Sequence, residues 1–100
     1  FCTIENMEGA SQIAEDLVEN RLAACVNIIP DVTSVYKWKG DLEKSTEQLM
    51  LIKTTKERLQ EVLDRIKILH PYEVPEIIAL PIEGGHPPYL SWLSSQVKGD

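Results

Sequence analysis

The chain has 100 residues, 43% of them hydrophobic, which suits a single domain, spanning residues 1–100, with one core. Its 16 acidic residues exceed its 10 basic ones and give a formal charge of −6, which argues against a nucleic-acid-binding protein. No apolar run approaches the roughly 20 residues of a membrane span, and two cysteines are too few for a disulfide scaffold, so we expect reduced thiols and a cytoplasmic location.

The first two elements are a strand and a helix. Residues 1–4 fit the end of a strand whose start precedes this sequence. Asn6 is expected to cap a helix that runs to about Asn20, because apolar residues recur at spacings of three and four. These positions are Ala10, Ile13, Ala14, Leu17 and Val18.

A long hairpin is expected from Leu22 to Thr54, folded back at Gly40-Asp41, with Pro30-Asp31 marking a bend or bulge in its first arm. Its root, 23–29 and 49–52, is almost continuously apolar, whereas its distal half mixes aromatic and charged residues. Each arm is roughly 40 Å long, about twice the length of a flanking helix. The distal half must therefore stand in water or be covered by another copy of the chain.

A second helix is expected after the hairpin. Thr54 and Glu57 have the spacing of a capping box. The helix ends at His70 because Pro71 disfavours helical geometry in the residue before it. Its apolar positions are Leu59, Val62, Leu63, Ile66 and Leu69.

The last third of the chain contains a proline-stiffened loop over 70–76, a strand over 76–82 and a helix over 89–97. Pro81 suggests an edge position for that strand. The whole order of elements predicts an α+β, ferredoxin-like split βαβ sandwich with a long central hairpin and a C-terminal helix. Because both longer helices cover one face of the sheet, the other face lacks intrachain cover, and we expect a homo-oligomer.

Six segments then point to a family: RLAACVNIIP, SVYKWKG, LIKTT, HPYEVPE, IIALPI and YLSWL. In this order and spacing they closely resemble the CutA family of divalent-cation tolerance proteins, over nearly the whole chain. The resemblance implies a ferredoxin-like fold and assembly as a homotrimer. It also implies an association with copper tolerance, as in bacterial members, or with anchoring of acetylcholinesterase, as in animal members.

The resemblance further implies a copper site. In bacterial members the ligands are a cysteine at the end of the first strand and two adjacent histidines, and these positions correspond to Cys2, Leu69 and His70. Since Leu69 cannot bind a metal, Cys2 and His70 remain as the candidate metal ligands. A thiolate and an imidazole both suit copper. The alternatives are a small buried hydrophobe for Cys2 and a histidine at a helix C-terminus for His70.

Other side chains have two interpretations each. Four aromatic residues, with three charged neighbours, could line a cleft between subunits or simply pack: Tyr36, Trp38, Tyr72 and Trp92, with Lys53, Glu73 and Glu76. Asp41, Glu43 and Glu47 could form a weak cation site or a solvated face that blocks edge pairing. No nucleophile, phosphate-loop, dinucleotide or metalloprotease motif is present, so we expect neither an enzyme nor an organic cofactor.

Three functions follow from these observations. The first is a homotrimer that binds copper or another divalent metal ion weakly. The second is a signalling module that resembles trimeric PII proteins and binds a small ligand between subunits. The third is a scaffold that anchors another protein.

Overall fold

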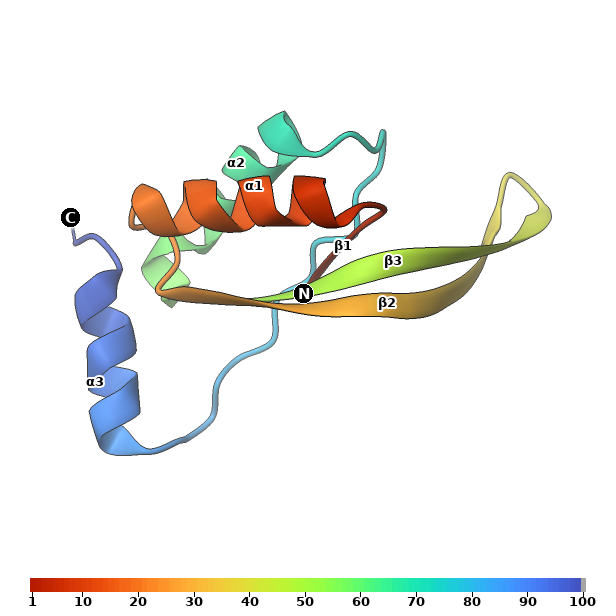
Figure 1. The fold of residues 1–100 in the computed structure, drawn as a ribbon. Coiled ribbons are helices and arrows are strands. Elements are labelled where there is room, and N and C mark those ends of the chain that lie inside the picture. Colours follow the sequence, from red (N-terminus) through yellow and green to blue (C-terminus); the bar gives the residue numbers. More distant parts are fainter. Residues whose placement is uncertain (100) are drawn as a thin grey trace.

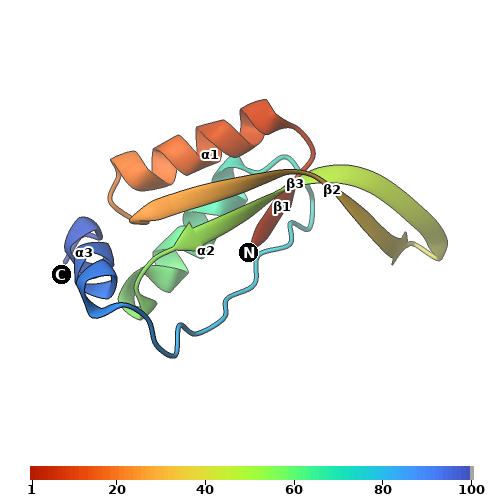
Figure 2. The ribbon, with the colours of Figure 1, turned by 60° about the horizontal axis from the view of Figure 1, so that its bottom comes forward.

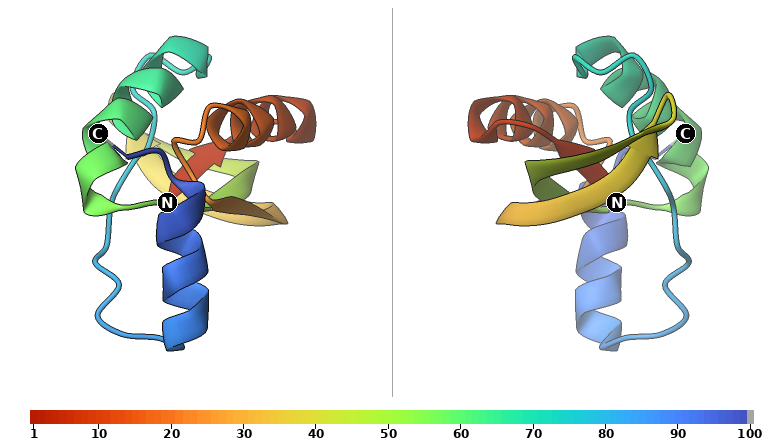
Figure 3. Two further views of the ribbon diagram at one scale, coloured as in Figure 1. Left: turned by 90° about the vertical axis from the view of Figure 1, so that its left-hand side faces the viewer. Right: turned by 90° about the vertical axis from the view of Figure 1, so that its right-hand side faces the viewer.

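The computed structural model describes residues 1–99. Helices α1 (Met7–Glu19) and α2 (Leu59–Leu69) cover one face of a three-stranded antiparallel sheet (Figure 1). The strand order is β1 (Cys2–Ile4), β3 (Asp41–Lys53), β2 (Cys25–Trp38), and a 3₁₀ turn, η1 (Lys56–Arg58), precedes α2. Helix α3 (Pro87–Gln96) lies beyond the opposite face of the sheet (Figure 3). This arrangement confirms the α+β, ferredoxin-like fold class.

Helix α1 begins as its sequence predicts. The Asn6 side-chain oxygen accepts a hydrogen bond from the amide of Gly9 at 2.7 Å, which satisfies a free donor of the first turn. A Cβ at Gly9 would lie only 2.9 Å from the Ile4 side chain, so glycine lets the helix start close against β1. The predicted apolar face is correct at its centre, but Val18 is 42% exposed and lies outside the core.

The hairpin forms with the predicted bulge. Strands β2 and β3 pair from Cys25↔Lys53 to Trp38↔Asp41, and the register shifts between Ile29 and Val32. The chain reverses at Lys39-Gly40, one residue earlier than predicted, where φ is 52° and 85°. Positive φ at both residues of a two-residue loop matches the right-handed twist of the strands, which is why a glycine is found there.

The predicted capping box at Thr54 and Glu57 is wrong. The Thr54 hydroxyl donates instead to the Leu22 carbonyl at 2.6 Å, and Thr55 precedes η1 without a side-chain cap. The amide of Ala24 donates to the Lys53 carbonyl at 2.8 Å, so the start of β2 holds Leu22 beside the end of β3. Because the Leu22 carbonyl lies within reach, the Thr54 hydroxyl bonds to it and does not cap an amide of the following helix.

The strand predicted over 76–82 is also wrong in extent. Within the described residues this segment makes one isolated bridge, Ile77↔Cys2, flanked by a backbone pair between Phe1 and Ile78. Two causes limit the ladder. Strand β1 is only three residues long, and Pro81 has no amide hydrogen to donate. The chain then passes the edge of the sheet and reaches α3 in an extended arc (Figure 2).

The main core lies between the two helices and the sheet. Its fully buried members include Ile4, Ile13, Leu17, Met50 and Ile66. A second, small cluster of Ala24, Leu93 and Val97 attaches α3, which starts at Pro87 rather than at the predicted Tyr89. No helix within residues 1–99 is long and apolar enough to cross a membrane.

Candidate functional site

The two predicted metal ligands meet at the end of β1. The carbonyl oxygen of Thr3 lies 2.7 Å from His70 Nε2 and 3.8 Å from Cys2 Sγ. Cys2 is fully buried, and His70 is 7% exposed where α2 ends. The topology therefore brings together two side chains that are 68 positions apart in the sequence.

Both groups are engaged in the structure. His70 Nδ1 accepts the amide hydrogen of Tyr72 at 3.1 Å, which places the ring proton on Nε2, where it is donated to Thr3. Burial, with smaller contributions from the charges of Glu76 and Glu47, raises the pKa of the Cys2 thiol to about 12. A metal ion at this place would thus have to displace protons and existing hydrogen bonds.

Two further observations on the described residues do not support a metal site. Leu69, at the position of the family's first histidine, is 37% exposed. No group of three or more Cys, His, Asp or Glu side chains within residues 1–99 is placed to hold a metal ion. Binding of copper by Cys2 and His70 stays a prediction.

A groove of about 810 Å³ lies beside this pair. It is bounded by the distal hairpin, by Thr3 of β1 and Glu5 just after that strand, and by the loop that follows His70. Its charged and aromatic lining consists of five carboxylates and three rings: Glu5, Glu43, Glu47, Glu73, Glu76, Tyr36, Trp38 and Tyr72. The structure thus brings together three of the four aromatic residues considered for a cleft, but neither Trp92 nor Lys53 lines the groove.

Strand pairing explains why these side chains share a face. Ser34 pairs with Ser45 and Tyr36 with Glu43, while Glu47 follows Ser45 by two residues. This is the face of β3 opposite to Met50, which packs under the helices. The groove therefore opens on the sheet face that α1 and α2 leave uncovered.

Glu47 is the one buried residue among the five carboxylates that line the groove. Its side chain accepts a hydrogen bond from the Tyr72 hydroxyl at 2.9 Å, and the residue is only 6% exposed. Burial and the adjacent Glu47 carboxylate raise the pKa of the Tyr72 phenol. The Tyr72 ring packs edge-on against His70 with centroids 4.5 Å apart, so the groove and the Cys2–His70 pair adjoin.

The sequence did not predict the buried state of Glu47 or the part played by Glu5. Glu47 was expected either in a weak cation site or on a solvated face near the hairpin tip. The only signal in the sequence is its period-two spacing with Glu43 along the strand.

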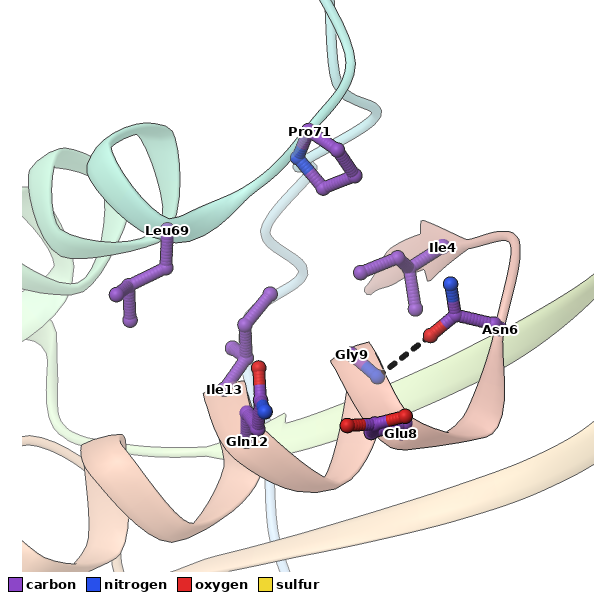
Figure 4. A pocket seen from close by; sticks show the side chains of 8 residues that line it. All are labelled: Ile4, Asn6, Glu8, Gly9, Gln12, Ile13, Leu69 and Pro71. Carbon is purple, nitrogen blue, oxygen red and sulfur yellow. Dashed lines mark hydrogen bonds between the residues drawn. The ribbon is translucent and has the colours of Figure 1, made fainter.

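A second hollow, of about 300 Å³, lies between the first turns of α1 and the end of α2 (Figure 4). One side carries the polar groups of Asn6, Glu8 and Gln12, and the Asn6 side chain is already bonded to Gly9. The other side is apolar and includes Ile13 and Leu69. Glu8 is the one titratable side chain among the described residues that line this hollow, so the hollow is a weaker candidate for a site than the groove.

Comparisons with known proteins place the chain in a family. A family model described as CutA1 divalent ion tolerance protein matches residues 1–96. The chain is 52% identical over 91 residues to the divalent-cation tolerance protein CutA of Thermus thermophilus, covering 91% of the chain and 88% of that protein. It is 50% identical over 97 residues to the protein CutA homolog of Xenopus laevis, covering 97% and 64%.

Solved structures agree with the sequence comparison. The crystal structure of CutA1 from Oryza sativa superposes with a TM-score of 0.96 at 40% identity, covering 99% of this chain and 91% of that one. The structure of the Thermus thermophilus divalent cation tolerance protein gives a TM-score of 0.94 at 48% identity, covering 97% and 94%. The chain spans about half the length of the mouse and human CutA proteins, 52% of each. The chain belongs to the CutA family of divalent ion tolerance proteins.

Proposed function

We propose that this chain acts as a homotrimeric divalent-cation tolerance protein that binds a divalent metal ion, copper by its ligand chemistry, weakly through Cys2 and His70. The observation that carries this proposal is the convergence of a thiol and an imidazole on the carbonyl oxygen of Thr3. Sulfur and imidazole ligands favour copper over the hard cations magnesium and calcium. The relative from Thermus thermophilus is itself named a divalent-cation tolerance protein.

The same geometry explains why binding would be weak. The Cys2 thiol must lose a proton held with a pKa of about 12, and His70 must give up a hydrogen bond to Thr3 or Tyr72. Two protein ligands also leave the remaining coordination positions to backbone groups, water or a neighbouring chain. Because binding releases protons, the affinity should rise with pH.

Assembly is supported by apolar surface that the single chain leaves open. On the distal hairpin Leu42 is 72% and Trp38 43% exposed, and Val35 is also exposed. The loop after His70 and the extended segment that follows it add four exposed apolar residues, Val74, Ile78, Leu80 and Ile82. Exposed apolar side chains in such number favour ordered self-association.

A metal titration followed by native mass spectrometry tests both parts of the proposal. The reduced protein is titrated with copper, and with zinc as a redox-inert probe, at two pH values. We expect a trimer that takes up one metal ion per chain, more at the higher pH. Cys2→Ser and His70→Gln should abolish uptake, whereas Cys25→Ser, which removes the other free thiol, should not. Uptake that survives in both Cys2→Ser and His70→Gln would refute the site.

The groove favours a second candidate function, binding of a small signalling ligand as in PII-type trimers. Its volume of about 810 Å³ lies within the range of small-molecule sites. Stabilisation by a ligand that is lost when Tyr72 is replaced by Phe would support this role. The third hypothesis, a scaffold that anchors another protein, would be supported by partner capture that depends on neither site.

A further inference from the structure

Helix α3 is attached to the rest of the domain through a small apolar cluster of its own. Leu93 is its one buried residue, and it packs with Val97, just after the helix, and with Ala24. Among the described residues, the main core under α1 and α2 includes none of α3. The described chain has no helix or strand between residues 78 and 86, so α3 follows a long irregular connection (Figure 2). The apolar contacts that hold α3 are therefore separate from the core that holds the other two helices.

On its own α3 would be a marginal helix. It has only ten residues, and isolated helices of this length are largely unfolded in water. No side chain of the described residues caps its first turn, and its last turn contains no basic residue that could bond to the free carbonyl groups. The carbonyl groups at its C-terminal end therefore depend on donors from elsewhere in the chain.

Two arginines supply these donors. Arg21 Nε and Nη2 donate to the carbonyl oxygens of Gln96 and Ser95, at 3.2 and 3.0 Å. The amide of Lys98 donates to the Arg21 carbonyl at 2.8 Å, and Arg58 Nε donates to the Lys98 carbonyl at 3.0 Å. A guanidinium at this end of a helix is also attracted by the negative end of the helix dipole. Arg21 and Arg58 thus bind the end of α3 to the segments that follow α1 and precede α2.

The backbone at Arg21 indicates that the guanidinium is the reason for an arginine there. Its φ of 56° lies in the left-handed region, directly after Asn20, the C-cap of α1. Glycine is the usual residue at such a position because it has no Cβ to strain the backbone. What arginine adds over glycine is the pair of hydrogen bonds to the end of α3.

The other arginine is held in place by a neighbouring carboxylate. Arg58 is 9% exposed, and its guanidinium donates to the carboxylate of Glu61. The same carboxylate pairs with Lys98 Nζ at 3.1 Å. Glu61 therefore orients the Arg58 side chain and attracts the residue to whose carbonyl Arg58 donates.

We propose that residues 87–98 form a strap that detaches from the domain and docks again as one unit, with Arg21 and Arg58 as its latch. Detachment breaks the hydrogen bonds at 95–98 and uncovers Ala24, directly before β2, without opening the main core. Because α3 depends on these partners for the cap of its C-terminal end, it loses its helical structure when it detaches. The strap contains neither Cys2 nor His70, so this proposal does not rest on the metal site.

Hydrogen exchange of the assembled protein, measured by mass spectrometry at several low urea concentrations, tests this proposal. In the wild type, α3 should exchange faster than α1, and urea should accelerate exchange in α1 but barely affect α3, because detachment exposes little surface. Arg21→Gly should accelerate exchange in α3 at least about tenfold, since two hydrogen bonds from a charged group are lost while glycine keeps the backbone conformation.

Arg65→Gln is the matched control for the loss of a guanidinium. The Arg65 side chain bonds to Asp16 and links α2 to α1, and these bonds include no residue of the strap. This variant should accelerate exchange in α1, because the main body of the domain becomes less stable. It should leave the exchange of α3 unchanged, because the docked and the detached states lose the same interaction.

Three outcomes would overturn the proposal. The first is wild-type exchange in α3 that is as slow as in α1 and has the same urea dependence, as when neighbouring copies hold the helix closed in the assembly. The second is unchanged exchange of α3 in Arg21→Gly, and the third is equal acceleration of α3 by Arg65→Gln. The urea dependence in the wild type decides the question if Arg21→Gly does not assemble.

Discussion

Replacing Trp38 by Ala should weaken the proposed trimer strongly. Trp38 is the last residue of β2, beyond the reach of the helices, and 43% of it is exposed in the single chain. For a side chain of roughly 250 Å², that leaves about 100 Å² for a neighbouring subunit to cover. At about 25 cal/mol per Å², full coverage contributes about 2.5 kcal/mol per chain. Three chains together give roughly 7 kcal/mol, or about five powers of ten in the association constant.

Sedimentation velocity over a wide range of protein concentrations measures this effect. The wild type should remain a trimer at dilutions where Trp38→Ala dissociates. Val18→Ala is a suitable control because Val18 has a similar exposed fraction, 42%, but lies on α1, on the face of the molecule that carries the helices. A Trp38→Ala protein that dissociates no more readily than the wild type would show that the hairpin end is peripheral. Equal weakening by Val18→Ala would show that the interface involves the helices instead.

Three further predictions concern the single chain. Thr54→Val should lower the free energy of unfolding in urea by about 1 kcal/mol, because the Leu22 carbonyl loses its donor, and Thr54→Ser should restore it. Met50→Ala should lower it by about 2–5 kcal/mol, because a fully buried side chain leaves a cavity. The Arg65 guanidinium, bonded to both Asp16 oxygens, lowers the pKa of that carboxyl below 3.8. Asp16→Asn should therefore destabilise the protein above pH 4, and the difference should vanish as the pH falls through the folded pKa.

Local patterns predicted the parts of the fold that local chemistry determines. Asn6 caps α1 because an asparagine directly before an apolar periodicity has an amide of the first turn within reach. The bulge at Pro30-Asp31 follows from a residue that cannot donate to the ladder. In both cases the partner lies within a few positions in the sequence or directly across a strand pair.

Predictions failed where a distant partner competed. Thr54 has the correct spacing for a capping box, but the Leu22 carbonyl, 32 positions away, binds its hydroxyl. The segment from Glu76 to Ile82 has the composition of a strand. The number of backbone pairs that it forms is limited by the length of its partner β1, which has only three residues. Neither competitor is visible from spacing within the segment itself.

At the two candidate sites, too, the sequence did not predict which hydrogen bonds each side chain makes. The family resemblance predicted Cys2 and His70 as metal ligands, yet both ring nitrogens of His70 already have partners and the thiol of Cys2 holds its proton tightly. Glu47 was expected in a weak cation site or on a solvated face, yet the residue is 6% exposed and its carboxylate accepts a hydrogen bond from the Tyr72 hydroxyl. A metal ion at the first site must break existing hydrogen bonds, and a ligand in the groove meets a carboxylate that already accepts from Tyr72. The free energy of binding at each site therefore depends on which bonds the fold has already made.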